Sequence, residues 1–485
     1  MKINKTFLIF ALLVVYSISN IAFSQSVIKI HLPQSEGKIA TIWTYKDLVS
    51  LSREVIKKTS FDKNDEINFT VNNSDIKKYF IEVRYLRISF LVDINTNYII
   101  EVAKVDFNNR DLYPKNVVGY LSPEINISTD NKSGDELNKD LDSLKIIFNN
   151  FTQQNYLSLI RGSNSRMLVD SLEIDANKFT SIHPHKYLKD YVSIQLAQFR
   201  KMSRQYGDDY IVETYFAKDK IAYNNPAFMS YFNTFWSKYI DKRMRYNVRK
   251  RLDSVINIQR SYQALSTLVG EDPLLLDSNL RELVILQNIP QLYKKEVFSR
   301  QALIDILYDI SSSKHNSIHK QIAINMRRRL ESNNDLDFHF IDSRGDSITL
   351  DNQKGKFVYI QLFDDECIKC LAEMNYTKEL YEEFDDIITF IHISVDRNEK
   401  DMLEVIKDKD YPWHFVFLED NYDFIQKYQV GVVPQAILID KDGSIIDYNA
   451  IQPSNYFKDW FLKMLNDRKG NLKTQYNERE GIRVR

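Results

Sequence analysis

The chain has 485 residues, of which 44% are hydrophobic and 27% are charged, which is typical of a globular protein and not of a disordered or collagen-like chain. Its 65 basic and 66 acidic residues nearly cancel, so no net charge favours nucleic acid or an acidic membrane surface as a partner. A chain of this length exceeds one ordinary hydrophobic core, and we expect several domains.

The first 24 residues have the features of a secretory signal peptide. Lys2 and Lys5 precede an apolar run at residues 7–15, and the small residues Ala22 and Ser24 form a cleavage site that predicts processing after Ser24. An uncleaved membrane anchor is the alternative, but the run is short for a span of about 20 residues. We therefore predict a signal peptide over 1–24 and a soluble protein exported to the periplasm or cell envelope.

Residues 27–130 predict a β-rich domain. Short runs of alternating hydrophobicity are separated by polar turn clusters such as 62–65 and 95–97. The runs lie at 27–32, 39–43, 67–71, 80–83, 88–92 and 98–102. Strands at this spacing are typical of a small antiparallel sandwich.

Residues 134–330 predict an α-helical region. Apolar residues recur there at helical spacing, as at Leu141, Leu144, Ile147 and Phe148. Four prolines are predicted to mark joints between helices. They are Pro184, Pro226, Pro273 and Pro290. A polar segment at 331–337 is typical of a linker to the next region.

Residues 336–466 alternate between strand and helix patterns, which predicts an α/β sheet with parallel pairing. The expected strands lie at 357–363, 388–395, 414–418, 435–440 and 445–448. The expected helices lie at 371–384, 399–408, 421–428 and 456–465. Residues 467–485 form a polar tail that we expect to be frayed.

Cys367 and Cys370 are the chain's two cysteines, and they stand between a predicted strand and a predicted helix. A disulfide that closes so small a loop constrains the unfolded chain little, so reactivity accounts for the pair better than stability. A helix N-terminus favours a thiolate, which makes Cys367 the expected nucleophile and Cys370 the resolving residue. Lys369 adds a nearby cation, whereas the acidic residues 364–366 act in the opposite direction.

Zinc binding, peroxidase chemistry and a purely structural role fit the cysteine pair less well. A zinc site needs four ligands, and His339, His392 and His414 lie in separate predicted strands. A peroxidase would carry Thr or Ser three residues before its cysteine, where Asp364 stands. A structural disulfide remains an alternative. We expect no metal, and no cofactor besides the redox-active disulfide.

Residues 336–466 resemble the thioredoxin superfamily, most of all the exported thiol-disulfide oxidoreductases of the TlpA/ResA type. The resemblance rests on the strand that leads into the cysteine pair, on Glu373, and on the Gly-Val-Val-Pro sequence at 431–434 followed by 435–443. It implies that Glu373 assists proton transfer near the dithiol. It also implies that Pro434 is cis beside the dithiol and that the backbone of Val433 docks the substrate.

Two of these residues have plainer alternatives. Glu373 could be a solvated residue in the first turns of a helix, and Pro434 could be an ordinary proline at the start of a strand. The sequence also departs from the family pattern, because Glu366 replaces a common tryptophan, Ile368-Lys369 replaces a Pro-containing dipeptide, and Asn375 replaces a proline. Since residues 366, 368 and 369 help to set the redox potential, the resemblance does not fix the direction of electron flow.

The strands of residues 27–130, with a turn such as 62–69, more loosely resemble the β-rich domains fused to thioredoxin-like domains in Bacteroidetes envelope proteins, and the helical segment carries no such resemblance. The predicted function is thiol-disulfide exchange with envelope proteins. Reduction is the preferred direction, and an oxidant or an isomerase is the alternative, since the redox potential decides the direction. The resemblance implies protein thiols and disulfides as partners and a membrane thiol reductant as the electron source. The alternative is an envelope binding or scaffold protein whose thioredoxin-like domain is accessory or redox-degenerate.

Overall fold

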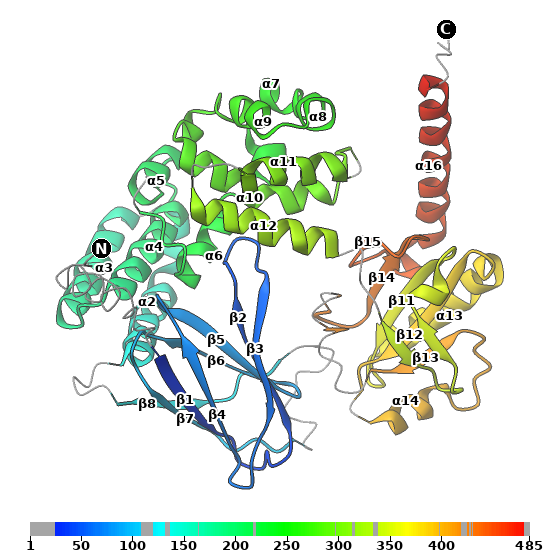
Figure 1. Cartoon of the computed structure of the whole chain (residues 1–485), viewed down its shortest axis with the longest axis horizontal. Coiled ribbons are helices and arrows are strands. Elements are labelled where there is room, and N and C mark those ends of the chain that lie inside the picture. The colour runs from blue at the N-terminus through cyan, green and yellow to red at the C-terminus, as the bar shows by residue number, and fades with distance from the viewer. Residues whose placement is uncertain are drawn as a thin grey trace, which may run out of the picture. The chain divides into compact units, whose positions relative to one another are not determined.

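Figure 1 shows a computed structural model of the chain. It describes residues 25–107, 120–130, 136–162, 164–216, 220–295, 297–312, 316–332, 338–396, 398–418, 424–425, 428 and 430–479. The predicted signal peptide and most of the predicted linker lie outside these residues, as does much of the helix expected at 421–428. Among the described residues, no helix combines the length and hydropathy needed to cross a bilayer.

The chain divides into two compact units. The first comprises residues 1–105 and 122–329, and the second comprises residues 106–121 and 330–485. The change from strands to helices near residue 130 therefore falls inside the first unit. The second unit holds the predicted α/β region and both cysteines.

Two four-stranded sheets form the β part of the first unit (Figure 1). One has the order β4 (Glu66–Asn72), β1 (Gln25–His31), β7 (Tyr98–Val102), β8 (Ile125–Thr129). The other has the order β3 (Arg53–Ser60), β2 (Ile39–Tyr45), β5 (Lys77–Val83), β6 (Leu86–Val92). The predicted β-rich region is confirmed, but the purely antiparallel pairing is wrong, because β1 and β7 run parallel.

Two strands of these sheets were not predicted, β3 and β8. Strand β3 pairs with β2 along its whole length, yet nearly all of its side chains are exposed. It lies at the edge of its sheet, where charged residues prevent pairing with other chains. An exposed edge strand has no buried face to impose the alternation from which strands are predicted.

Helices fill the rest of the first unit, which confirms the predicted α-helical region. They are α2 (Leu137–Arg161), α3 (Ser165–Ile182), α4 (Lys186–Met202), α5 (Asp208–Tyr215), α6 (Pro226–Phe235), η2 (Tyr239–Arg243), α7 (Tyr246–Arg249), α8 (Leu252–Ser254), η3 (Val255–Gln259), α9 (Tyr262–Val269), η4 (Pro273–Leu275), α10 (Ser278–Tyr293), α11 (Arg300–Ser312) and α12 (Ser317–Ser332). Leu141, Leu144 and Phe148 of α2 are buried in one core cluster, as their spacing predicts.

Three of the four prolines lie at helix joints. Pro184 separates α3 from α4, Pro226 begins α6 and Pro273 begins η4. The prediction for Pro290 is wrong, since it lies inside α10. A proline removes one intrahelical hydrogen bond, and here it does so close to the end of the helix, where the buried Ile289 and Leu292 hold the last turn.

The second unit is built on a five-stranded sheet. Its order is β13 (His414–Phe417), β12 (Ile388–Ser394), β11 (Phe357–Phe363), β14 (Gln435–Ile439), β15 (Ile445–Asp447). The remaining elements are β9 (His339–Ile341), β10 (Ser347–Thr349), η6 (Asp351–Gln353), α13 (Ile368–Phe384), α14 (Glu399–Ile406), η7 (Pro453–Asn455) and α16 (Phe457–Arg479). The α/β fold is confirmed.

The pairing in this sheet is mixed, so the expectation of a parallel sheet was only partly right. Strands β11, β12 and β13 are parallel, but β14 is antiparallel to both β11 and β15. A short turn joins β14 to β15, and so short a connection permits only an antiparallel hairpin. The final helix also extends well beyond the predicted end at residue 465.

Central strand β11 is buried along its whole length. Alternate side chains of the strand face one side, where Phe357 and Tyr359 contact Phe461 and Phe457 of α16. The next residue on that face is Gln361, which contacts α13 through Thr377. Helix α13 therefore covers the carboxyl end of β11, and its own N-terminus begins where the loop after β11 ends.

Candidate active site

The cysteine pair opens helix α13. Cys367 is the N-cap residue of this helix, and its Sγ accepts a hydrogen bond of 3.1 Å from the backbone N–H of Cys370. The two cysteines form a disulfide, with Cα atoms 5.2 Å apart. Backbone N–H groups at a helix N-terminus stabilise negative charge, so the first sulfur lies where a thiolate is favoured.

The two cysteines differ from their neighbours in exposure. Cys370 is fully buried and Cys367 is 3% exposed, whereas the intervening Ile368 is 83% exposed. Glu366 and Lys369 are also exposed. An incoming chain would therefore meet residues 366, 368 and 369 around the first cysteine, with the second cysteine held in the core.

Val433 and Pro434 lie at the same end of the sheet as the disulfide. The register of β11 and β14 pairs Leu362 with Gln435, which places Pro434 across from the last residue of β11. The Val433–Pro434 peptide bond is cis. Val433 is buried in the core cluster that contains both cysteines. The fold thus brings the 433–434 segment, 63 positions beyond the pair in sequence numbering, to the end of the strand that leads into the pair.

Glu373 is buried one turn beyond Cys370. Glu373 is 2% exposed, which excludes the alternative that it is a solvated residue in the first turns of the helix. Its two carboxylate oxygens accept hydrogen bonds from the backbone N–H of Ser454, at 2.9 Å, and from its hydroxyl, at 2.5 Å. Burial and the Glu373 carboxylate hold the pKa of Tyr359 well above its ordinary value. A buried carboxylate therefore lies on α13, the helix that begins at the cysteine pair.

A chain of buried polar side chains lies beneath α13. Gln361 Oε1 accepts from His392 Nε2 at 2.9 Å and from Thr377 Oγ1 at 3.3 Å. Gln361 Nε2 donates to Gln452 Oε1 at 3.2 Å, and Gln452 Nε2 donates to the carbonyl oxygen of Pro434 at 3.4 Å. This series of hydrogen bonds links strand β12 through β11 to the cis-proline segment.

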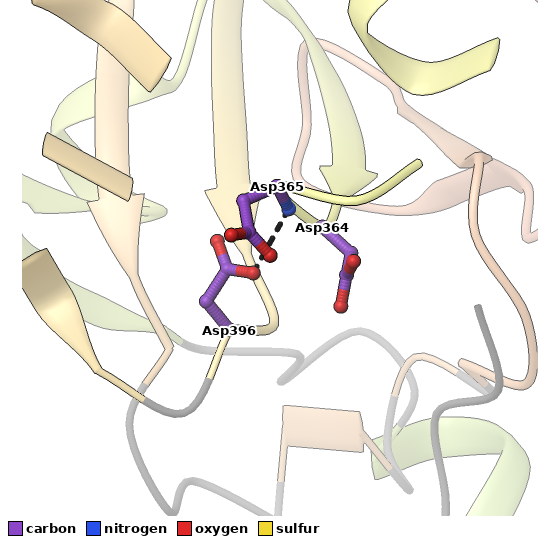
Figure 2. Close-up of side chains that lie close together, drawn as sticks. All are labelled: Asp364, Asp365 and Asp396. Atoms are coloured by element: carbon purple, nitrogen blue, oxygen red, sulfur yellow. Dashed lines mark hydrogen bonds between the residues drawn. The ribbon is translucent and has the colours of Figure 1, made fainter. Parts of the chain in front are cut away.

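Three carboxylates gather beside the loop that precedes Cys367 (Figure 2). The carboxylates of Asp364, Asp365 and Asp396 each offer one oxygen within 4.8 Å of the others. Asp396 Oδ1 accepts from the backbone N–H of Asp365 at 2.9 Å, and its Oδ2 accepts from Ser394 Oγ at 2.7 Å. Asp396 follows β12, so parallel pairing of β11 and β12 brings it to the end of β11.

Burial raises the pKa of Asp396 to about 7, and repulsion from Asp364 and Asp365 adds to the effect. The hydrogen bonds from Ser394 and Asp365 oppose this rise without cancelling it. Among the described residues, this trio is the group of acidic and histidine side chains close enough to share a cation. Since the Asp396 oxygens already accept two hydrogen bonds, we assign no ion to it.

Sequence reasoning found the two cysteines, Glu373 and the 433–434 segment, but it missed Asp396 and Ser454. The signal for Asp396 was its place directly after a predicted strand, because the carboxyl ends of neighbouring parallel strands lie at the same edge. Ser454 carried no such signal. His339, His392 and His414, which were weighed as zinc ligands, have separate partners in Ser347, Gln361 and Asp342.

Comparison with known protein families identifies the fold of the second unit. Residues 355–445 match the family model described as thioredoxin-like, a span that includes both cysteines, Glu373 and Pro434. The C-terminal domain is thioredoxin-like.

Curated relatives of this domain are thiol-disulfide oxidoreductases. ResA of Bacillus cereus is 31% identical over 111 residues, which are 23% of this chain and 64% of the relative. ResA of Bacillus anthracis is 32% identical over 111 residues, with the same two shares of 23% and 64%. The chain thus spans about 64% of the length of the curated relatives it matches. The C-terminal quarter is related to ResA-type oxidoreductases and carries a cysteine pair.

Two of the similar solved structures come from Bacteroides. The thioredoxin domain of a thiol-disulfide oxidoreductase from Bacteroides vulgatus is 27% identical, covers 25% of this chain and 89% of that chain, and has a TM-score of 0.24. A thiol:disulfide interchange protein from Bacteroides sp. is 28% identical, covers 25% of this chain and 82% of that chain, and has a TM-score of 0.24.

Proposed function

We propose that this protein is a thiol-disulfide oxidoreductase of the cell envelope that reduces disulfides in exported proteins. The observation that carries the proposal is the position of Cys367, whose sulfur caps α13 and accepts the N–H of Cys370. The buried Glu373 and the 433–434 segment at the end of β11 add support. Placement in the envelope rests on the signal peptide predicted at residues 1–24.

The proposed reaction is a two-step exchange that begins from the reduced dithiol. The Cys367 thiolate attacks one sulfur of a substrate disulfide, a mixed disulfide forms, and the other substrate sulfur leaves as a thiolate that takes up a proton. Cys370 then loses its proton and attacks Cys367 Sγ. This second step releases the remaining substrate thiol and forms the Cys367–Cys370 disulfide, so two electrons pass from the dithiol to the substrate.

Glu373 is the proposed acceptor of the Cys370 proton in the second step. A fully buried thiol needs a base within the protein, because bulk water does not reach it. Glu373 lies on the same helix, three residues beyond Cys370, and it is buried as well. Ser454 holds both of its oxygens with two hydrogen bonds, which orients the carboxylate.

Reduction is the proposed direction for an electrostatic reason. A thiolate that is strongly stabilised makes the reduced form stable and the disulfide a strong oxidant. Acidic residues 364–366 directly precede Cys367 and oppose the stabilising effect of the helix N-terminus on its thiolate. Their charge therefore favours a reducing couple. A membrane thiol reductant is the proposed source of electrons, by resemblance to the TlpA/ResA type.

Trapping of the mixed disulfide tests the proposal. In Cys370→Ser the second step is blocked, so Cys367 should accumulate in mixed disulfides with envelope proteins, visible as adducts that disappear on treatment with dithiothreitol. Cys367→Ser is the matched control and should trap none. The wild-type protein should reduce insulin in the presence of dithiothreitol, and both variants should fail to do so. Absence of adducts together with absence of insulin reduction contradicts the proposed activity.

The reduction potential tests the direction separately. Equilibration of the Cys367–Cys370 couple against glutathione should give a potential close to that of thioredoxin, about −270 mV, if the protein is a reductant. A potential near about −120 mV, typical of a strong oxidant, would leave the exchange chemistry intact but reverse the proposed direction.

A further inference from the structure

A groove in the first unit lies between one face of the β3-β2-β5-β6 sheet and helices α6 and α10. Its volume is about 640 Å³, within the range of small-molecule sites. Tyr45, Leu48 and Phe80 line it from the sheet side, and Met229 and Pro290 line it from the helices. These side chains give the groove a largely apolar lining with aromatic rings on one wall.

Lys78 also lines this groove. Within the described part of the chain, neither a carboxylate nor another hydrogen-bond acceptor contacts Lys78 Nζ. The side chain is half-buried, and burial lowers the pKa of Lys78, with repulsion from Lys145 and Arg87 in the same direction. A desolvated, unpaired cation is unfavourable, so its retention in a groove calls for a physical reason.

On the same face of the sheet, two other cations each pair with a carboxylate and also contact an aromatic ring. Arg53 and Arg87 lie over the Trp43 ring, with guanidinium carbons 3.6 and 5.6 Å from its centre, and both bind the carboxylate of Glu82 at 2.8 and 2.9 Å. The Glu82 carboxylate thus forms ion pairs with two cations that also contact an aromatic ring.

Lys78 repeats half of that arrangement further along β5. Its Nζ lies 5.3 Å from the centre of the Phe80 ring, and Phe80 stacks on Trp43 with ring centres 4.1 Å apart. The aromatic support and the cation are therefore present, but no carboxylate from the described residues completes the arrangement. Lys145 and Arg87 have their own partners in Asp142 and Glu82, so Lys78 alone of these three cations lacks one among the described residues.

We propose that this groove binds a small organic anion, whose carboxylate pairs with Lys78 and whose flat apolar body packs against Tyr45, Phe80 and Met229. The charge of Lys78 selects an anion, and the apolar lining selects a hydrophobic body of modest size. The volume matches a free small molecule better than a folded partner. The site is independent of the dithiol chemistry proposed above.

Calorimetric titration of the full chain with 4-phenylbutyrate tests this assignment. The neutral 4-phenylbutanamide serves as the matched ligand control. The acid should bind at least about tenfold more tightly than the amide, because one charge-assisted hydrogen bond is worth about that factor or more. Equal binding of acid and amide, or no binding of the acid, overturns the proposal.

Variants of two neighbouring lysines test whether Lys78 is the residue that pairs with the ligand carboxylate. Lys78→Met keeps the apolar stem and should weaken binding of the acid about tenfold or more, whereas Lys78→Arg should retain most of it. Lys77→Met is the matched control, since Lys77 projects from the opposite face of β5 and should leave binding unchanged. Loss of binding in both Met variants, or in neither, rejects the assignment to Lys78.

Two further readouts separate binding from damage to the fold. Lys78→Met should raise the melting temperature of the ligand-free protein, because it removes a buried charge without a partner. A lowered melting temperature would mean that Lys78 is structural, which contradicts the proposal. Tighter binding of an acidic, phenylalanine-containing hexapeptide than of 4-phenylbutyrate would assign the groove to peptides and overturn the small-molecule site.

Discussion

Ser454 donates both its backbone N–H and its hydroxyl to the carboxylate of Glu373, across 81 positions of the chain. The contact joins η7 to the first half of α13 and fixes a buried carboxylate on the helix that the two cysteines begin. Because each oxygen of Glu373 accepts one of these bonds, the carboxylate has a defined orientation in the core. The proposed proton acceptor is therefore held rigidly in place.

Glu373→Gln should slow disulfide exchange. The amide has nearly the same shape but cannot take a proton from Cys370, so the release of the mixed disulfide should slow about 10- to 100-fold at pH 7. Stopped-flow measurement of that step at pH 7 checks this expectation. The exposed Glu379 on the same helix provides the control variant Glu379→Gln, which should behave as wild type. An unchanged rate in Glu373→Gln would remove this residue from the mechanism.

Asp396→Asn should change how stability depends on pH. Folded Asp396 holds its proton up to about pH 7, whereas the unfolded residue loses it near 3.8. The folded state therefore binds more protons in that window, and its stability falls as the pH rises from about 4 to 7. Asp396→Asn removes this loss and should be more stable than wild type at pH 8 by on the order of 2–3 kcal/mol in urea unfolding. The two proteins should be similar at pH 4.

The exposed Asp386 supplies the control for this experiment, and Asp386→Asn should leave the pH dependence unchanged. A stability difference between wild type and Asp396→Asn that stays constant from pH 4 to 8 would show that the carboxyl of Asp396 does not hold its proton in the fold.

His392→Phe should alter stability in the opposite pH direction. Burial lowers the pKa of His392 to about 3 from 6.5, so the unfolded state binds more protons between these values. Wild-type stability is therefore lost as the pH falls below about 6.5, by on the order of 2 kcal/mol at pH 5. The introduced phenyl ring would fit the aromatic cluster with Trp413 and Phe415 and should make this part of the loss disappear. An acid-induced loss in the variant as steep as in wild type would contradict the assignment.

Gln361→Met should destabilise the second unit more than Thr377→Val does. Gln361 takes part in three side-chain hydrogen bonds, to His392, Thr377 and Gln452, and its loss leaves buried groups without partners. We expect a cost of about 3 kcal/mol for Gln361→Met and about 1 kcal/mol for Thr377→Val, measured as free energies of unfolding in urea. Equal costs would mean that the polar chain beneath α13 adds little to stability.

Local sequence patterns predicted the parts of the fold that have a regular buried face. The spacing of Leu141, Leu144 and Phe148 predicted α2, and the uninterrupted apolar run at 357–363 predicted β11. Strand β3 and the placement of Pro290 were missed because long-range packing decides them. An exposed edge strand shows no alternation, and a proline near a helix end is tolerated when tertiary packing holds the last turn.

The features of the candidate site also fall into those that the sequence determined and those that only the tertiary structure decided. The cysteine pair and its place between a strand and a helix follow from short-range spacing, so the sequence determined them by itself, whereas Glu373 was singled out by the family resemblance. Burial of Glu373 by Ser454, 81 positions away, and the contact between Asp396 and the Asp365 N–H, 31 positions away, came only from the tertiary structure. Strand order and register bring such residues together, and these depend on packing of the whole sheet, which no local pattern encodes.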